Sequence, residues 1–573
     1  MRVRYVLLAA LLCAGAAFPQ SLRDLADQRG IKIGAAVDPS HFTESLYATT
    51  LAREFNQAEP ENAMKFGPIH PGLTTYNFDP ADQIVAFAQS HSMAIRGHNL
   101  VWYNQLPGWL TSANYTPEQL SSILQDHINT VAGRYAGKLS AWDVVNEAFN
   151  GDGTLRSYLW YDSPGIGLKG TGYIEQAFRW AHAADPKALL FYNDYSAETI
   201  NTKSDAIYRM AQDFKARGVP IDGIGLQMHF TTNTGSLASM EANIKRITDL
   251  GLEVQITELD VRLPVNSGVA SAASLATQAQ IYHDITALCL KFPLCTAIQS
   301  WGFTDKYSWI PGTYPGFGGA LEFDTNYQPK PAYTSIQNAL QTAPPLISAA
   351  GLVNGASYAG GAVAPGEIVL LYGATFGPST LDFGAQTSQT RLLFDGVAAP
   401  ILYSQVGQTA AIVPFAVAGK VSTQVEYEYL GQRSAAITVS VTPAQPGVFS
   451  LDSSGQGAGA IVDASGQIVS RNHPAHHGDV ISVFITGGGA TLPASQDGQV
   501  LFDGPFPLLA ATPQVKIGGV DCPVPYAGGA SGLIAGVAQI NVQVASGVAS
   551  GEQSLIVVQG TSGSQSGLTV WVQ

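Results

Sequence analysis

The sequence predicts an α/β protein: a (β/α)8 TIM barrel followed by an all-β C-terminal region of two Ig-like sandwich units. Between residues 31 and 340, short β-branched segments alternate with segments of helical spacing, which is typical of strands joined by helical crossovers. After "QTAPPLIS" (341–348) helical periodicity almost vanishes, and Val-rich alternation punctuated by Gly and Pro takes over. The 573 residues also exceed the roughly 250 to 300 that one core usually supports.

Residues 1–20 are predicted to be an export signal. Arg2 and Arg4 precede an apolar run from Val6 to Ala17, and the small residues Ala14, Gly15 and Ala16 near its end suit cleavage. Lipid attachment at Cys13 is an alternative, which the large residue before it disfavours. We therefore expect a secreted, extracellular protein, with surface attachment or periplasmic retention as the alternatives.

The charge balance indicates what kind of partner to expect. A net charge of −14 with 29 Lys plus Arg argues against nucleic acid or anionic lipid as the main partner, so a neutral substrate fits better. No stretch after the signal approaches the roughly 20 apolar residues of a membrane helix. We expect a monomer that needs no cofactor and no metal.

Eight candidate strands occur in the first part of the chain, within a domain expected to span 21–342. They are 31–37, 55–62, 94–102, 140–147, 188–195, 221–229, 252–260 and 296–305. Segments of helical spacing lie between them, such as 82–92, 173–184, 204–218 and 274–292. Most of these strands end in Glu, Asn, His, Trp or Asp, and active sites of such barrels lie at the carboxyl ends of the strands.

Two glutamates stand at matching strand ends, Glu147 in "WDVVNEAF" and Glu258 in "QITELD". They end the fourth and seventh strands, so in a closed barrel they face one another across its mouth. Retaining glycoside hydrolysis requires two such carboxylates about 5 to 5.5 Å apart, one as acid/base and one as nucleophile. A structural salt bridge is the alternative for either glutamate alone, but the pair at matching ends favours catalysis.

Neighbouring polar residues are expected to support this pair. His229 in "LQMHF" lies in reach of both Glu258 and Asp260, and a histidine between them would keep Glu258 ionised and aligned. The alternative for His229 is a satisfied core histidine. Asn146, directly before Glu147, offers an amide to a sugar hydroxyl beside the broken bond.

Residues 22–340 resemble family 10 glycoside hydrolases, a group dominated by endo-β-1,4-xylanases. The resemblance is carried by motifs in order: "PENAMK", "GHNLVW", "QLPGWL", "WDVVNEAF", "LLFYNDY", "GIGLQMH", "QITELD", "WGFTDKYSWIPG" and "PKPAY". It implies a retaining endo-β-1,4-xylanase acting on xylan and xylo-oligosaccharides, with Glu258 as nucleophile and Glu147 as acid/base.

The resemblance also implies which residues bind the sugar. Glu61, Asn62 and Lys65 would hold the sugar two places toward the non-reducing side. The residues implied around the sugar under attack are His98, Trp102, Asn146, Gln227, Trp301 and the covering Trp309. Sugar rings pair an apolar face with a rim of hydroxyls, so a cleft that mixes Trp with amides and charges suits them. A core role for Trp102 and Trp301, and a structural Lys65–Glu61 ion pair, are the alternatives.

Three positions depart from the family pattern. Tyr103 stands where His is usual, Phe66 where Trp is frequent, and Asn99 where Thr is frequent. None removes a catalytic group, so only the subsites and the pH optimum are affected. Two rival functions stay open: a β-1,4-glucanase or cellobiosidase on the same scaffold, and a non-catalytic glycan-binding or adhesion protein.

The C-terminal region contains an internal repeat. "FDGVAAPILYS" at 394 aligns with "IGGVDCPVPYA" at 517, and the flanking segments match as well, which predicts sandwich units at 346–443 and 444–573. Tyr403 and Tyr526 occupy equivalent positions and are interpreted as core residues. The region is expected to act as a spacer or in surface attachment, or to contact polysaccharide, with Trp571 as its single Trp.

Three cysteines follow the signal. Cys289 and Cys295 are close enough in "CLKFPLC" to form a disulfide in an oxidising compartment, with buried thiols as the alternative. Cys522 is left over and is expected to be buried.

Overall fold

The structure is a computed structural model that describes residues 20–378, 381–383 and 389–573. The predicted export signal, except for its last residue, lies outside the described residues. Contacts divide the chain into two compact units, one with the described residues up to Asp27 and Ile31–Leu340, the other with Gln28–Gly30 and Gln341–Gln573.

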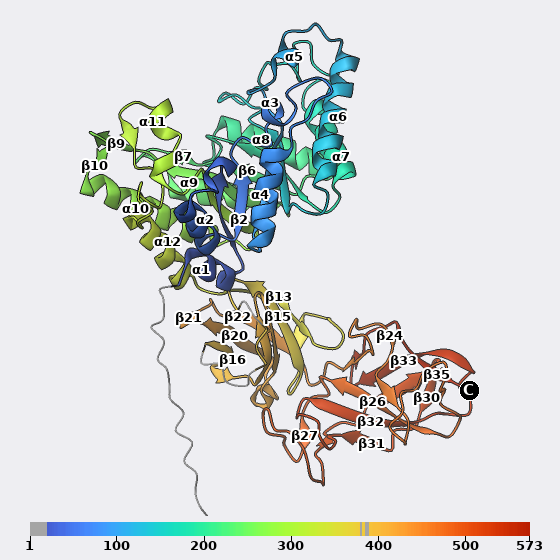
Figure 1. Cartoon of the computed structure of the whole chain (residues 1–573). Coiled ribbons are helices and arrows are strands. Elements are labelled where there is room, and N and C mark those ends of the chain that lie inside the picture. The colour runs from blue at the N-terminus through green and yellow to red at the C-terminus, as the bar shows by residue number, and fades with distance from the viewer. Residues whose placement is uncertain (1–19, 379–380, 384–388) are drawn as a thin grey trace, which may run out of the picture. The chain divides into compact units, whose positions relative to one another are not determined.

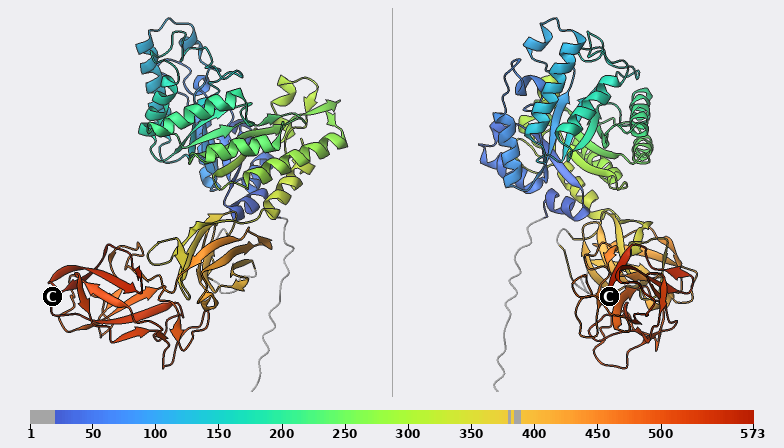
Figure 2. Two further views of the ribbon diagram at one scale, coloured as in Figure 1. Left: turned by 180° about the vertical axis from the view of Figure 1, so that it is seen from behind. Right: turned by 90° about the vertical axis from the view of Figure 1, so that its right-hand side faces the viewer.

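The first unit is a closed parallel barrel, which confirms the predicted fold (Figures 1 and 2). Within residues 20–340, all of which the structure describes, its eight strands are β1 (Lys32–Val37), β2 (Gln57–Pro60), β3 (Ala94–Val101), β4 (Ala141–Asn146), β5 (Leu189–Asp194), β6 (Gly223–Leu226), β8 (Glu253–Val261) and β11 (Cys295–Ser300). Strand β11 closes the ring because it pairs with both β1 and β8. The two-residue β7 (His229–Phe230) adds to the end of β8.

Helices surround the strands and connect them (Figures 1 and 2). The longer ones are α1 (Leu22–Arg29), α2 (Ser45–Glu54), α4 (Asp79–Ser90), α6 (Pro117–Arg134), α7 (Gly172–Ala184), α8 (Thr202–Ala216), α9 (Leu237–Thr248), α10 (Ala272–Cys289) and α12 (Pro331–Thr342). The short ones are α3 (Phe66–Ile69), α5 (Gly108–Thr111) and α11 (Ile310–Thr313). Capping is explicit in the sequence: Thr116 and Gln119 form a capping box at the start of α6, and Asn201 and Ser204 form one at α8.

Burial explains why the barrel strands read as nearly continuous apolar runs. Strands β4 and β8 are buried along almost their whole length, since helices cover the outside and side chains fill the inside. Beyond the barrel wall, β9 (Leu263–Asn266), β10 (Val269–Ala270) and β12 (Phe317–Gly318) form a small sheet in the loops at the carboxyl ends. The strand ends therefore carry the polar residues that line the mouth.

The second unit contains antiparallel sheets, as predicted. Among the described residues of 346–443, one sheet has the order β13-β15-β19-β18 and the other β14-β22-β20-β16-β17 with β21 beside β20. The strands are β13 (Leu346–Asn354), β14 (Ala362–Val363), β15 (Ile368–Ala374), β16 (Thr390–Phe394), β17 (Val397–Ala398), β18 (Ile401–Gln405), β19 (Gln408–Ile412), β20 (Ser422–Tyr429), β21 (Gln432–Arg433) and β22 (Ile437–Val441).

Residues 444–573 pair their strands in a matching order. One sheet runs β23-β26-β32-β31-β28-β27 with β25 beside β26, and the other β24-β35-β33-β29-β30 with β34 beside β33. The strands are β23 (Gly447–Val448), β24 (Gly457–Ala458), β25 (Ile461–Val462), β26 (Val480–Thr486), β27 (Thr491–Leu492), β28 (Leu508–Leu509), β29 (Gln514–Ile517), β30 (Val520–Cys522), β31 (Tyr526–Gly528), β32 (Val537–Gln543), β33 (Gly551–Gln559), β34 (Ser562–Gly563) and β35 (Leu568–Val572). The repeated sequence segments thus occupy equivalent hairpins, β16–β17 and β29–β30. The assignment of either sandwich to the Ig-like class stays a prediction.

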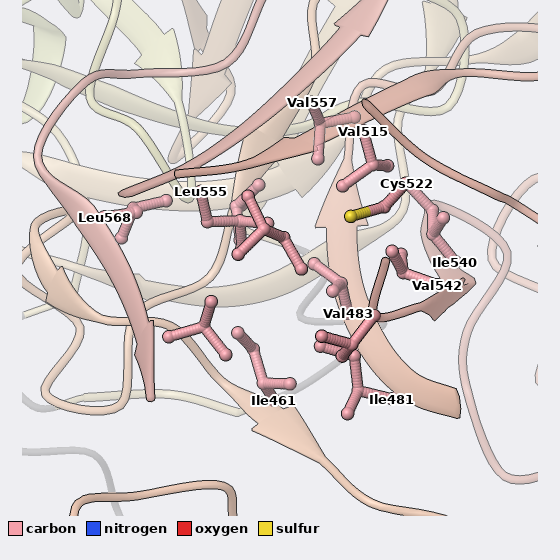
Figure 3. Close-up of a cluster of buried hydrophobic side chains, with 14 of the residues drawn as sticks. Ile461, Ile481, Val483, Val515, Cys522, Ile540, Val542, Leu555, Val557 and Leu568 are labelled. Atoms are coloured by element: carbon pink, nitrogen blue, oxygen red, sulfur yellow. The ribbon is translucent and has the colours of Figure 1, made fainter. Parts of the chain in front are cut away.

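Each sandwich has its own apolar core. Figure 3 shows the second, in which Ile481, Val483, Ile540 and Leu555 meet the buried Cys522. Interpreting Tyr403 and Tyr526 as core residues is wrong: both are only half-buried and lie outside the core clusters. The repeat preserves an outward position here, because equivalent strands present the same face in both sandwiches.

Two other expectations concern the chain as a whole. Cys289 at the end of α10 and Cys295 at the start of β11 form a disulfide. Among the helices that the structure describes, none combines the length and the apolar composition needed to cross a membrane.

Candidate active site

A single cleft at the carboxyl ends of the barrel strands gathers almost all the predicted site residues. Its volume is about 1070 Å³. The predicted residues that line it are Glu61, Asn62, Lys65, His98, Trp102, Asn146, Glu147, Gln227, His229, Glu258, Trp301 and Trp309. Asp260 does not line the cleft but lies behind His229. Mixed carboxylates, amides and indoles make this a site suited to a polyhydroxylated ring.

Glu147 follows β4 and has an unusual backbone. Its φ of 58° lies in the left-handed region, which a residue with a Cβ adopts only when neighbours hold it there. The Glu147 amide donates to the Asn193 carbonyl at 2.9 Å, and Arg156 Nε donates to the Glu147 carbonyl at 3.0 Å. These two contacts turn the side chain into the cleft.

A chain of hydrogen-bonded amides connects Glu147 to Glu258. Gln227 Nε2 donates to Glu147 Oε1 at 3.0 Å and to Asn146 Oδ1 at 3.3 Å. Asn193 Nδ2 donates to Asn146 Oδ1 at 2.9 Å and to Glu258 Oε1 at 2.8 Å. Strands β5 and β6 lie between β4 and β8, so their terminal amides bridge the gap that separates the two carboxylates. The amides thereby hold the two carboxylates at fixed positions in the cleft.

Glu258 also bonds to a histidine and, through it, to a second acid. His229 Nε2 lies 3.0 Å from Glu258 Oε2, and His229 Nδ1 lies 2.9 Å from Asp260 Oδ2. Trp309 Nε1 donates to the same Asp260 oxygen at 2.9 Å. Since ionised carboxylates only accept hydrogen bonds, both ring nitrogens can be satisfied at once only if the imidazole is protonated.

The pKa directions agree with this assignment. Burial alone would lower the pKa of His229, but Asp260 and Glu258 raise it well above its ordinary value. Burial alone would raise the pKa of Glu258, but the His229 hydrogen bond and the nearby His98 hold it below its ordinary value. Glu258 is therefore kept ionised although it is almost fully buried.

Lys65 lies between two indoles on another side of the cleft. Its Nζ is 4.9 Å from the Trp102 ring centroid and 5.2 Å from that of Trp301, and it donates to Asn62 Oδ1 at 3.1 Å. Burial lowers the pKa of Lys65, an effect that the charges of Glu258 and Glu61 oppose. The ammonium thus faces the cleft with its charge balanced by carboxylates around it.

A cluster of buried charged residues positions His98. Its Nδ1 lies 3.0 Å from Asp143 Oδ2, and Arg96 bonds both oxygens of that carboxylate. Glu59 is fully buried beside them, and burial followed by the charge of Asp143 raises its pKa well above the ordinary value. Among the described residues, Glu59, His98 and Asp143 are the group whose ligand atoms lie close enough for a metal ion, within 4.8 Å of one another. Arg96 already neutralises this cluster, so its chemistry fits the positioning of His98 better than metal binding.

The three departures from the family pattern lie in different places. Tyr103 lines the cleft, and the Arg156 guanidinium lies 4.2 Å from its ring centroid. Asn99 is buried and its Nδ2 is 3.2 Å from His98 Nε2. Phe66 is buried in the interior and stacks on His127 at 3.7 Å. Tyr103 and Asn99 therefore adjoin the site, whereas Phe66 acts through packing.

Comparison with known proteins decides the family. The family model described as "Glycosyl hydrolase family 10" matches residues 21–339. The chain belongs to glycosyl hydrolase family 10. The resemblance inferred from the motifs is thus confirmed, and with it the enzyme class of a glycoside hydrolase.

Relatives of this family 10 chain are named for one activity. It is 45% identical over 323 residues to endo-1,4-beta-xylanase B of Thermotoga neapolitana, covering 56% of this chain and 91% of the relative. It is 42% identical over 343 residues to endo-1,4-beta-xylanase D of Talaromyces funiculosus, covering 59% and 82%. Among solved structures, xylanase 10B of Thermotoga petrophila RKU-1 in complex with xylobiose aligns with a TM-score of 0.55 and 46% identity, covering 57% of this chain and 99% of that one. The residues that the family model matches, 21–339, correspond to the barrel.

Some residues around the cleft were not predicted as site residues. Tyr195, Glu198 and Asn201 line it, and Asn193 completes the amide chain. Asn193 and Tyr195 stand at the end of the fifth strand, so their position on the mouth could have been predicted, although not their contacts. The buried cluster of Arg96, Asp143 and Glu59 had a signal too, namely charges of opposite sign inside apolar strands.

Proposed function

We propose that this chain is a secreted, retaining endo-β-1,4-xylanase that hydrolyses internal bonds of xylan through a covalent glycosyl-enzyme. The names of its relatives support the substrate, and the xylobiose bound by one solved neighbour supports a xylo-oligosaccharide ligand. The observation that carries the mechanism is the pair Glu147 and Glu258, which line one cleft and share one chain of amides but have different partners.

The roles follow from those different partners. Glu258, ionised by His229, attacks the anomeric carbon while Glu147 gives its proton to the departing oxygen. A bond forms between Glu258 and the sugar, and the shortened xylan chain leaves. Glu147, now ionised, takes a proton from water, whose oxygen displaces Glu258 and restores the starting configuration. The mechanism needs the two carboxyl groups about 5 to 5.5 Å apart.

Secretion is part of the proposal. It is supported by the apolar N-terminal segment with its preceding arginines and by the Cys289–Cys295 disulfide, since disulfides persist in oxidising compartments. We also propose a monomer, a catalytic domain over 21–342 and sandwich units at 346–443 and 444–573.

The test follows the anomer that is released. Proton NMR of xylohexaose hydrolysis should show the β-anomer first, and Glu258→Ala should abolish turnover, with azide restoring release as an α-glycosyl azide. First appearance of the α-anomer would refute the retaining mechanism. Equal or greater release of reducing sugar from carboxymethyl-cellulose than from xylan would refute the choice of substrate.

A further inference from the structure

One face of the first sandwich carries an outward row of tyrosine and glutamine side chains. Tyr372 of β15 pairs directly with Gln408 of β19, and Gln408 pairs with Gln405 of β18. Successive residues of a strand alternate between faces, and Leu371 beside Tyr372 is fully buried in the core. Tyr372 and the two glutamines therefore point outward, and Tyr403, two positions before Gln405, shares their face.

Further aromatic rings extend the row. Tyr372 and Phe383 are 40% and 76% exposed, values unusual for large aromatic rings. The Phe383 ring centroid lies 6.4 Å from that of Tyr403. We call Tyr372, Phe383, Tyr403, Gln405 and Gln408 the tyrosine row.

The amides of the row are already ordered. Gln408 Nε2 donates to the Tyr403 hydroxyl at 2.7 Å, and Gln405 Nε2 donates to Gln408 Oε1 at 2.9 Å. A carboxamide offers two N–H donors and an oxygen with two lone pairs, so these contacts use only part of its capacity. The row thus combines fixed rings with donors and acceptors that remain for a partner.

The charge of the row indicates the class of that partner. None of its five side chains is ionised at neutral pH, although the chain carries a net charge of −14. A charged partner finds no counter-charge among these side chains, whereas a neutral pyranose polymer presents apolar ring faces to the aromatic rings and hydroxyls to the amides. A neutral row therefore complements a neutral polysaccharide.

Trp571 is a weaker candidate for the same role. It is half-buried, and the Arg471 guanidinium lies over its ring at 5.6 Å. One face of the indole is therefore already occupied by a charged group.

We propose that the tyrosine row binds xylan chains and keeps the barrel on insoluble substrate. This inference rests on the proposed function, because the choice of xylan follows from what the barrel is proposed to cleave. Linking two sites that bind one polymer raises the effective concentration of the second site, so even a weak row increases retention.

The test is a binding isotherm on insoluble xylan, measured by depletion of the full-length protein. All variants carry Glu258→Ala so that the polymer is not digested, and the cleft contributes equally to each. The double variant Tyr372→Ala, Tyr403→Ala should bind at least about fivefold more weakly, the effect expected of residues that anchor an interface. Tyr372→Phe keeps the ring and Trp571→Ala leaves the row intact, so both should bind within about twofold of the parent.

Unchanged binding by the double variant, or a loss confined to Trp571→Ala, would overturn the proposal. Retention on cellulose without retention on xylan would overturn the choice of polymer. If circular dichroism shows that the double variant unfolds at a lower temperature than the parent, xylan binding by Gln408→Ala is compared with that of the parent instead. The same loss of at least about fivefold is then expected. Hydrolysis of soluble xylan by the wild-type protein is measured separately. Absence of hydrolysis would refute the proposed function, whereas the binding isotherms would still test whether the tyrosine row binds xylan.

Discussion

Replacing His229 by Asn should raise the pH below which the enzyme loses its activity. Glu258 is active when ionised, and its pKa is held down by the imidazolium 3.0 Å from its Oε2, so activity is lost only as pH falls through that lowered pKa. At an effective dielectric constant of about 20, two unit charges at this distance interact by about 5 kcal/mol. Asp260 shares the positive charge of His229, so the net effect is smaller.

We therefore expect the acid limb of kcat/KM against pH to move upward by about one to three pH units in His229→Asn, the range for a carboxylate that loses an adjacent cation. The assay is initial-rate hydrolysis of an aryl β-xylobioside between pH 3 and 9. The matched control is His91→Asn, an exposed histidine at the end of α4, which should leave the profile unchanged. An acid limb that stays in place in His229→Asn would refute the electrostatic role of the histidine, whatever happens to the maximal rate.

Three further outcomes are expected from the same contacts. Asn193→Ala removes the donor shared by Glu258 and Asn146, and should lower kcat about 10- to 100-fold with little change in KM, as steady-state kinetics would show; a change in KM alone would contradict it. Arg96→Met removes the guanidinium partner of the buried Asp143 and leaves it only the His98 contact, so it should destabilise the barrel by about 3 to 5 kcal/mol in urea unfolding; an unfolding midpoint near that of the parent would contradict this role of the ion pair. Cys289→Ser opens a short loop and should lower the unfolding free energy by about 2 kcal/mol under oxidising conditions, with no difference from the parent expected once both are reduced.

The strands and the cleft were accessible from the sequence because their signals are local. Most barrel strands are short, mainly apolar runs that end in polar residues, and the side chains at those ends meet once the ring closes. The network behind them is not local. Whether His229 turns toward Glu258, or Asn193 donates to it, depends on side-chain rotamers that packing selects across strands remote in sequence.

Tyr403 and Tyr526 show a different limit. The two residues are equivalent in the repeat, because Tyr403 lies in β18 and Tyr526 lies in the matching strand β31. Equivalence alone does not tell which face of a strand a residue occupies. A strand alternates its faces with every residue, so a bulge such as that between Ile401 and Tyr403 moves the pattern by one. The glutamines that follow at 405 and 408 were the better signal of an outward face.

Closure of the barrel by β11 bears on how the polypeptide is made. Strand β1 leaves the ribosome early, yet one of its two partners, β11, is more than 250 residues further along the chain. Until that partner is synthesised, one edge of β1 and one edge of β8 have no neighbour, and exposed strand edges invite association between chains. A nascent chain that is translocated while still being synthesised would pass its barrel through the membrane before the ring can shut, and would meet the oxidant that joins Cys289 to Cys295 only on the far side.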